Sequence, residues 1–204
     1  KHVTDIDIYH THEDRDEYNN GLFWHTDHYL PARRATHRTF SRDHNADQNK
    51  NKGGGGPGTE HCYSSGLLLH YYLTGNEKSK AAVESLANWM INIEEGNGTI
   101  LERLFIFMKS DIVNIKKLLA GKKILNYRYP FTRGTGNYIT TLLDAFQLSA
   151  NKKYLKLCER VIGQMLGPLD NIDDRNLADI EANWSYLVAL QAVAKYLDVK
   201  ESLD

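Results

Sequence analysis

Apolar residues recur at helical spacing in the region after residue 58, and the clearest run comes first. This run supplies four apolar positions on one side of a helix: Leu67, Leu68, Tyr71 and Tyr72. Thr59 is a favourable N-cap residue, and Gly75 suits the left-handed position just beyond a helix C-terminus. The pattern therefore predicts a helix that begins at Thr59 and ends near Thr74.

A second amphipathic run follows after a short polar turn. It begins near Lys78 and ends at Gly96–Asn97–Gly98. Its apolar positions are Ala82, Val83, Leu86, Ala87, Met90 and Ile91. The same helix–turn–helix pattern returns at 142–165, an offset of 142 − 67 = 75 residues. Two helical hairpins are therefore predicted.

A third unit is predicted to begin near Trp184. Its first helix has apolar positions Leu187, Leu190, Val193 and Leu197. A turn near Asp198 should lead into a further helix from Lys200. Leu197 lies 197 − 148 = 49 residues after Leu148, which is close to the length of a two-helix repeat.

Repeated hairpins of this kind form either an open solenoid or a closed toroid, because each hairpin buries one face against its neighbours. Irregular, aromatic-rich repeats with long loops favour the toroid. A partly helical insertion is expected at 99–127. A complete ring of hairpins needs more residues, so we predict an all-α, incomplete (α/α) helical-hairpin toroid. We expect one domain over 1–204, with a long irregular His- and Gly-rich segment at 1–58 and hairpins at 59–204.

Net charge, hydropathy and cysteine spacing exclude some classes of protein but do not identify the function. The 204 residues carry a formal net charge of −1, so general affinity for nucleic acid or an anionic membrane is not expected. No run of 18 apolar residues predicts a membrane span, and the first residues do not resemble a signal peptide. Cys62 and Cys158 lack metal-type spacing, and each falls within a predicted helix. We expect two free, partly buried thiols, with a disulfide left open. The sequence does not indicate the cellular compartment.

The chemistry-bearing residues are concentrated before and at the start of the first predicted helix. Five histidines occur within a short stretch: His25, His28, His37, His44 and His61. They are accompanied by aromatic and arginine side chains. Such a segment is costly to bury, and it is more often a working surface than a core.

Three interpretations of this segment compete. His25, Asp27, His28 and His37 include zinc-ligand types, but not at helix-borne spacing. Alternatively, the histidines belong to a structural loop network. The interpretation we favour is acid/base chemistry on a uronic sugar, which requires a base such as His or Tyr and a cation that neutralises the carboxylate. We therefore expect no metal and no cofactor, with zinc or calcium left open.

Two loops precede the predicted hairpins and should fall on one rim. The Gly53–Gly58 run lacks a following Gly-Lys-Ser/Thr, so it is either a linker or a close-approach loop for an anion, not a phosphate loop. The 127–138 loop contains two arginines and three tyrosines. Arg128 and Arg133 either bind sugar carboxylates or cap the helix, and Tyr129 and Tyr138 either stack on a sugar or fill the core. The acidic residues before Trp184 are better explained as a helix first turn.

Several motifs in the first half of the chain together resemble a known family. These motifs are His25–Tyr29, Thr36–Arg38, Gly54–Tyr63 and Gly66–Asn76. They resemble the α/α toroid domain of exo-rhamnogalacturonan-lyase-like proteins. That resemblance implies cleavage of a pectin-type backbone by β-elimination, with the toroid as the C-terminal part of a larger enzyme that also has β-sandwich domains.

The sequence thus predicts a carbohydrate-active domain, a polysaccharide lyase that acts on an acidic, pectin-type glycan. The candidate catalytic residues are His28, Tyr29, His37, His61 and Tyr63. The candidate substrate-binding residues are Trp24, Arg38, Glu60, Arg128 and Arg133. A glycoside hydrolase that uses Asp27 and Glu60 and a non-catalytic helical-repeat binding module are the alternatives. The expected partner is an acidic polysaccharide, with homo-oligomers or further domains left open.

Overall fold

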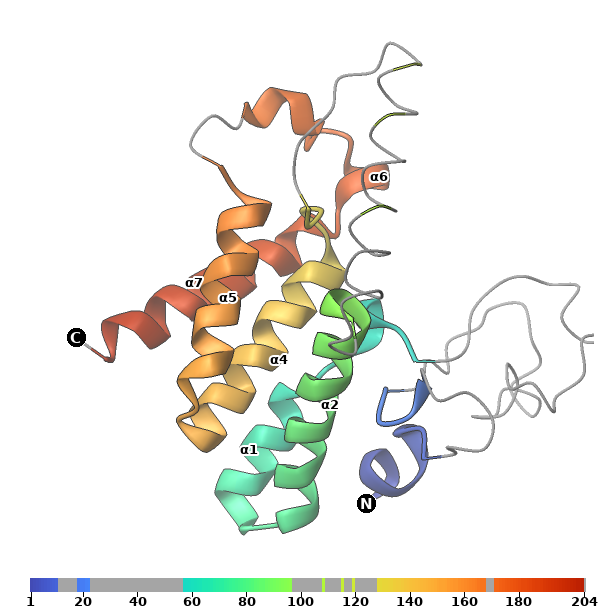
Figure 1. The fold of residues 1–204 in the computed structure, drawn as a ribbon, viewed down its shortest axis with the longest axis vertical. Coiled ribbons are helices and arrows are strands. Elements are labelled where there is room, and N and C mark those ends of the chain that lie inside the picture. Colours follow the sequence, from blue (N-terminus) through green and yellow to red (C-terminus); the bar gives the residue numbers. More distant parts are fainter. Residues whose placement is uncertain are drawn as a thin grey trace, which may run out of the picture.

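A computed structural model describes most of the helical region and part of the N-terminal segment. The described residues are 1–10, 18–22, 57–96, 128–167 and 171–203, together with Met108, Ile115 and Leu119. Within them the only extended pairing is an isolated antiparallel bridge between Ile8 and Leu22. The described part of the protein is therefore all-α, as predicted (Figure 1).

The helices follow the predicted order. Their bounds are η1 Val3–Asp7, η5 Thr59–His61, α1 Ser65–Thr74, α2 Glu77–Glu95, α4 Arg133–Ser149, α5 Lys152–Met165, η6 Ile172–Arg175, α6 Ile180–Asn183 and α7 Tyr186–Glu201. α1 with α2, and α4 with α5, form antiparallel hairpins that lie side by side (Figure 1). Among the described residues, no helix is long and apolar enough to span a membrane.

The two hairpin turns use the same chemistry 75 residues apart, since 149 − 74 = 75. The hydroxyl of Thr74 donates to the carbonyl of His70 at 2.6 Å, and the hydroxyl of Ser149 donates to that of Ala145 at 2.7 Å. Each hydroxyl thus donates to the carbonyl four residues earlier, in the last turn of its own helix. The repeat predicted from sequence is therefore confirmed in structural detail.

The next two residues of each turn also correspond. Gly75 and Ala150 both adopt the left-handed conformation, with φ of 66° and 53°. Asn76 and Asn151 are the N-caps of the second helices, and each side chain accepts a backbone N–H from the first turn. Local residue chemistry therefore accounts for where these helices end and begin.

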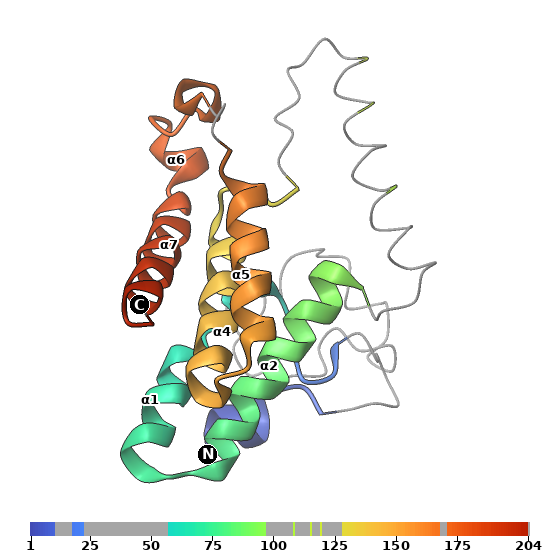
Figure 2. The same cartoon turned by 60° about the vertical axis from the view of Figure 1, so that its left-hand side comes forward.

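α4 is the central helix of the described structure. It packs against α1, α2, α5 and α7 (Figures 1 and 2). Most of its length is buried, including the fully buried Tyr138, Ile139, Leu142 and Leu143. Gly136 allows α7 to approach closely, because a Cβ at this position would lie 2.7 Å from the Ala189 backbone nitrogen. The core is thus built around α4.

The described part of the N-terminal segment also contributes to the core, although the sequence predicted only an irregular segment there. Ile8 and Tyr9 are buried, and the bridge to Leu22 lies beside α2. A Cβ at Gly21 would lie 2.6 Å from the Trp89 ring of α2, so the chain passes directly over that indole. The ring is buried under residues that are far away in sequence.

The prediction that the first helix begins at Thr59 was wrong. Thr59–His61 forms a single 3₁₀ turn, and α1 begins only at Ser65. Between them the chain is extended at Cys62, and both Cys62 and Ser64 are buried. The Ser64 hydroxyl donates to Asp144 and Thr141 of α4 instead of capping α1. Tertiary contacts to α4 therefore shift the helix start.

The predicted turn at Asp198 was also wrong, because α7 continues without interruption to Glu201. Three of the four residues in its predicted apolar stripe face outward: Leu187, Leu190 and Leu197 are 53%, 45% and 59% exposed. The fourth, Val193, is partly buried against the core. The small residues Ala189 and Ala192 are buried instead. Close approach to Gly136 requires small side chains, and this requirement sets the rotation of α7.

The two cysteines are buried free thiols. Cys158 lies in α5 as predicted, whereas Cys62 precedes α1 and so lies outside any helix. Burial raises the pKa of each thiol to about 12. Both side chains therefore act as small core residues, not as thiolate nucleophiles. The predicted insertion at 99–127 lies outside the described residues, except for Met108, Ile115 and Leu119, which are helical.

Candidate functional site

The segments that precede α1 and α7 meet Arg133, the first residue of α4. The Arg133 Nε donates to Glu60 Oε2 at 2.9 Å, and its Nη2 lies 3.4 Å from His61 Nε2. Its guanidinium carbon lies 5.1 Å from the centre of the Trp184 ring. These residues, together with Tyr63, are called the Arg133 cluster below.

The first turns of α4 hold the η5 segment in place. The Asn137 side-chain amide donates to the carbonyls of Thr59 and Glu60 at 3.1 and 3.0 Å. A Cβ at Gly134 would lie 3.0 Å from Glu60 Oε1, so this glycine allows the carboxylate to pack over α4. The backbone that carries Glu60 and His61 is therefore held by contacts that do not depend on the Glu60–Arg133 ion pair.

Two aromatic rings in the cluster are accessible. Tyr63 is 54% exposed and Trp184 is 48% exposed. The Tyr63 ring meets the His61 ring edge to face, with centroids 6.4 Å apart. Exposed rings beside a cation and hydrogen-bonding groups are typical of surfaces that bind polar ligands with apolar faces, sugars among them.

The environment of His61 favours its neutral form. Burial lowers the pKa of the imidazole, the nearby Arg133 charge lowers it further, and Glu60 raises it. The folded-state pKa thus lies below the ordinary value of 6.5, so the ring is neutral and can accept a proton at neutral pH. The linked stability is complete above pH 6.5 and declines as the pH falls from there through the folded-state pKa.

Neighbouring charges give a test of this environment. We expect Arg133→Gln to raise the pKa of His61, because it removes the cation, and Glu60→Gln to lower it, because it removes the anion. NMR titration of the imidazole C–H resonances measures both shifts. Shifts of the same sign in both variants would contradict the proposed arrangement.

The structure brings together four residues predicted from sequence and separates a fifth. Glu60, His61, Tyr63 and Arg133 lie in one cluster. Arg128 instead pairs with Glu95 at the end of α2, with Nη2 and Oε2 3.2 Å apart. The two arginines of the loop before α4 therefore belong to different sites.

The expectation that Tyr129 and Tyr138 could stack on a sugar is contradicted. Their exposed fractions are 2% and 0%. The Tyr129 hydroxyl donates to Glu95, which ties it to α2. Both rings belong to the core, because α4 is surrounded by other helices at this level.

The remaining candidates lie outside the described residues. These are Trp24, Asp27, His28, Tyr29, His37 and Arg38. The roles assigned to them stay predictions. Within the described part of the chain, no group of three or more His, Cys, Asp or Glu side chains is arranged to hold a metal ion.

Trp184 was not chosen from the sequence as a site residue. The acidic residues that precede it suggested only the first turn of a helix. A usable signal was nevertheless present, because Trp184 lies just before α7 as Glu60 lies just before α1, while Arg133 begins α4. Loops at equivalent positions of a repeat fall on the same side of the array.

Comparison with protein-family models, with curated proteins and with solved structures found no match. The resemblance to exo-rhamnogalacturonan-lyase-like proteins therefore remains a hypothesis that rests on the sequence motifs.

Proposed function

We propose that the Arg133 cluster binds an acidic sugar and that the protein is a polysaccharide lyase. The observation that carries this proposal is the convergence of a guanidinium, a neutral imidazole and two exposed rings from three separate segments. Abstraction of a proton next to a carboxylate requires a base and a cation side by side. His61 and Arg133 meet that requirement.

In the proposed reaction, the Arg133 guanidinium binds the uronate carboxylate with the donors that Glu60 leaves free. The His61 imidazole removes the proton from the adjacent ring carbon. The electron pair of that C–H bond forms the C4=C5 double bond, and the C4–O4 bond breaks. The leaving oxygen takes a proton from Tyr63 or from water, and solvent restores both side chains. Trp184 and Tyr63 supply surfaces on which sugar rings stack.

The proposed architecture is an arc of an (α/α) toroid, with the Arg133 cluster on its inner rim. Supporting this, the α1–α2 and α4–α5 hairpins lie side by side, and the segments before α1 and α7 both meet the first residue of α4.

The test is ultraviolet absorbance of unsaturated uronate during incubation with pectic and other uronic polysaccharides. We expect a rise with the unaltered protein and a loss of roughly 100-fold or more in rate for His61→Ala, the size typical of a general base. His70→Ala is the matched control, because it makes the same substitution on α1 and should leave the rate unchanged.

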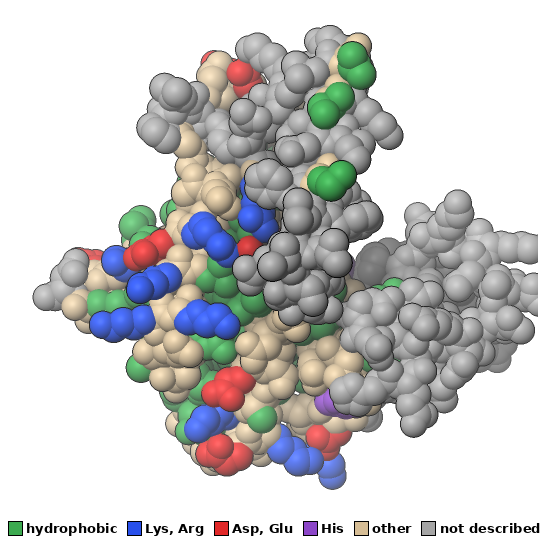
Figure 3. Space-filling model, viewed as in Figure 1, with side chains coloured by type: hydrophobic (Ala, Val, Ile, Leu, Met, Phe, Trp, Pro, Cys, Tyr) green, Lys and Arg blue, Asp and Glu red, His purple; other side chains and the backbone are tan. Residues whose placement is uncertain are grey.

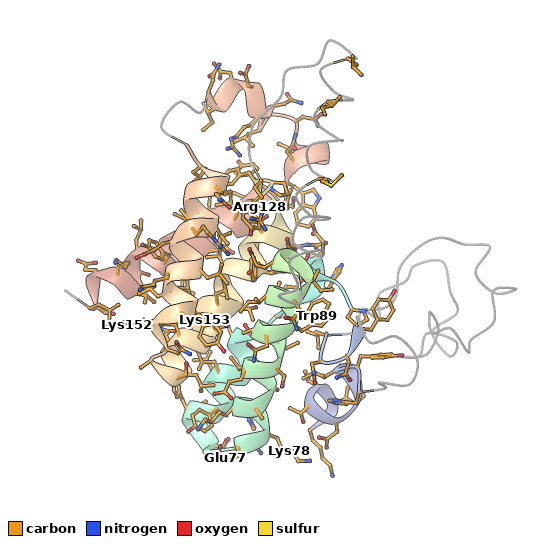
Figure 4. All side chains as sticks on the ribbon, in the orientation of Figure 1. Glu77, Lys78, Trp89, Arg128, Lys152 and Lys153 are labelled. Carbon is orange, nitrogen blue, oxygen red and sulfur yellow. The ribbon has the colours of Figure 1, made fainter. Side chains whose placement is uncertain are left out.

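Arg133→Gln should also abolish most of the rate, whereas Lys78→Gln should not. Lys78 pairs with Asp5 at the opposite end of the hairpins, so it controls for the loss of one positive charge (Figure 4). New reducing ends without absorbance would indicate hydrolysis, which is the Asp27/Glu60 alternative. Binding without either product would support a non-catalytic module, for which the same exposed rings suffice. The absence of binding and products would overturn the carbohydrate proposal.

A further inference from the structure

A second candidate site lies between the C-terminal end of α2 and α5. Here a groove of about 660 Å³ opens to the surface. Its lining is Ile91, Glu95, Gly96, Arg128, Lys153, Lys156, Leu157 and Arg160. A volume of this size falls within the range of small-molecule sites. Figure 3 shows Lys and Arg side chains gathered over the face where α5 lies.

The charges of the groove are aligned along α5. Lys153, Lys156 and Arg160 are separated by three and four residues, so they lie on one face of the helix. At about 1.5 Å per residue, the row from Lys153 to Arg160 extends over roughly 10 Å. Arg128 adds a fourth cation from the loop before α4 (Figure 4).

Glu95 fixes the positions of Arg128 and Arg160 but does not cancel the positive charge of the groove. Its carboxylate is 11% exposed and pairs with Arg128 at 3.2 Å and with Arg160 at 2.7 Å. The Tyr129 hydroxyl donates to the same carboxylate. Two guanidinium groups thus share one lining carboxylate. Among the described residues, Lys153 and Lys156 form no ion pair, so the lining carries an excess of positive charge.

The lining distinguishes this groove from the Arg133 cluster. No aromatic side chain lines it within the described part of the chain, so it lacks the stacking surface that suits a sugar ring. It has two fixed guanidinium forks and two lysines, which are the groups that bind phosphate oxygens most effectively. We propose that this groove binds a small molecule that carries two or more linked phosphate groups. This site is independent of the proposed lyase function.

The test is isothermal titration calorimetry of the unaltered protein with inorganic tripolyphosphate, with adenosine triphosphate and with citrate. We expect both phosphate ligands to bind at least tenfold more tightly than citrate, a tricarboxylate. Tighter binding of the nucleotide than of tripolyphosphate would identify an organic phosphate as the ligand class. The organic part of such a ligand would contact Ile91 or Leu157. Tighter binding of tripolyphosphate would identify an inorganic one. Equal affinity for citrate would show charge attraction only and would overturn the proposal.

The substitutions Lys153→Gln and Lys156→Gln together are expected to weaken tripolyphosphate binding at least tenfold. Neither side chain contacts Glu95, so the fold should tolerate the change. Lys152→Gln is the matched control, because it removes the same charge from the neighbouring residue, which does not line the groove (Figure 4). An equal effect of Lys152→Gln would overturn the site. NMR shifts should map to 153–160 and Gly96, and shifts confined to other residues would also overturn it.

Discussion

Asp144→Ala is expected to lower the free energy of unfolding by about 3–5 kcal/mol, because it removes one partner of a buried ion pair. Asp144 of α4 is completely buried, and its carboxylate pairs with Lys195 of α7. It also accepts the hydroxyl protons of Ser64 and Ser65, which begin α1. One carboxylate therefore links three helices, and its loss leaves Lys195 without its counter-ion and the Ser65 hydroxyl without its carboxylate acceptor.

Urea unfolding followed by circular dichroism measures this loss. Asp198→Ala is the matched control, since Asp198 lies exposed on α7 and its replacement should change stability by no more than about 0.5 kcal/mol. A double-mutant cycle with Lys195→Met isolates the pair itself, and we expect a coupling energy above ~1 kcal/mol. If Asp144→Ala costs no more than the Asp198 control, the buried network does not hold the helices together.

Gly136→Ala is expected to destabilise the protein by roughly 1–3 kcal/mol, as overpacking of a tight core does. The added Cβ would lie 2.7 Å from the Val188 carbonyl oxygen and from the Ala189 nitrogen. These atoms belong to the α7 backbone, so α7 as a whole must move to relieve the clash.

Gly163→Ala is the control for helix propensity. Gly163 also lies inside a helix, α5, but nothing is found within 4 Å of an added Cβ. Since alanine favours helix over glycine by up to about 1 kcal/mol, Gly163→Ala should stabilise the protein. Opposite signs for the two substitutions, measured by thermal unfolding, are the expected result. The same sign would show that α4 and α7 do not approach as closely as the structure indicates.

The candidate site was only partly predictable from the sequence. Glu60, His61, Tyr63 and Arg133 were chosen by residue type and by their place before a helical unit, and the structure brings them together. The same reasoning grouped Arg128 with Arg133, although Arg128 pairs with Glu95. Residue type alone could not show that these two arginines belong to different sites. Each arginine turns toward its carboxylate partner, which is Glu95 of α2 for Arg128 and Glu60 of η5 for Arg133.

The hairpin turns were determined by the sequence alone. Gly75 and Asn76 act through bonds to their own neighbours, and the same local chemistry recurs at Ala150 and Asn151. Such signals do not depend on the rest of the fold, so the turns and the helices beside them could be predicted.

Only the tertiary structure decided where α1 begins and which face of α7 is buried. Ser64 is a good N-cap residue, yet its hydroxyl donates to Asp144, 80 residues away. α7 buries Ala189 instead of its leucines, because Gly136 admits only a small neighbour. In both cases a distant partner competes with a local preference, and burial makes the distant contact the stronger one.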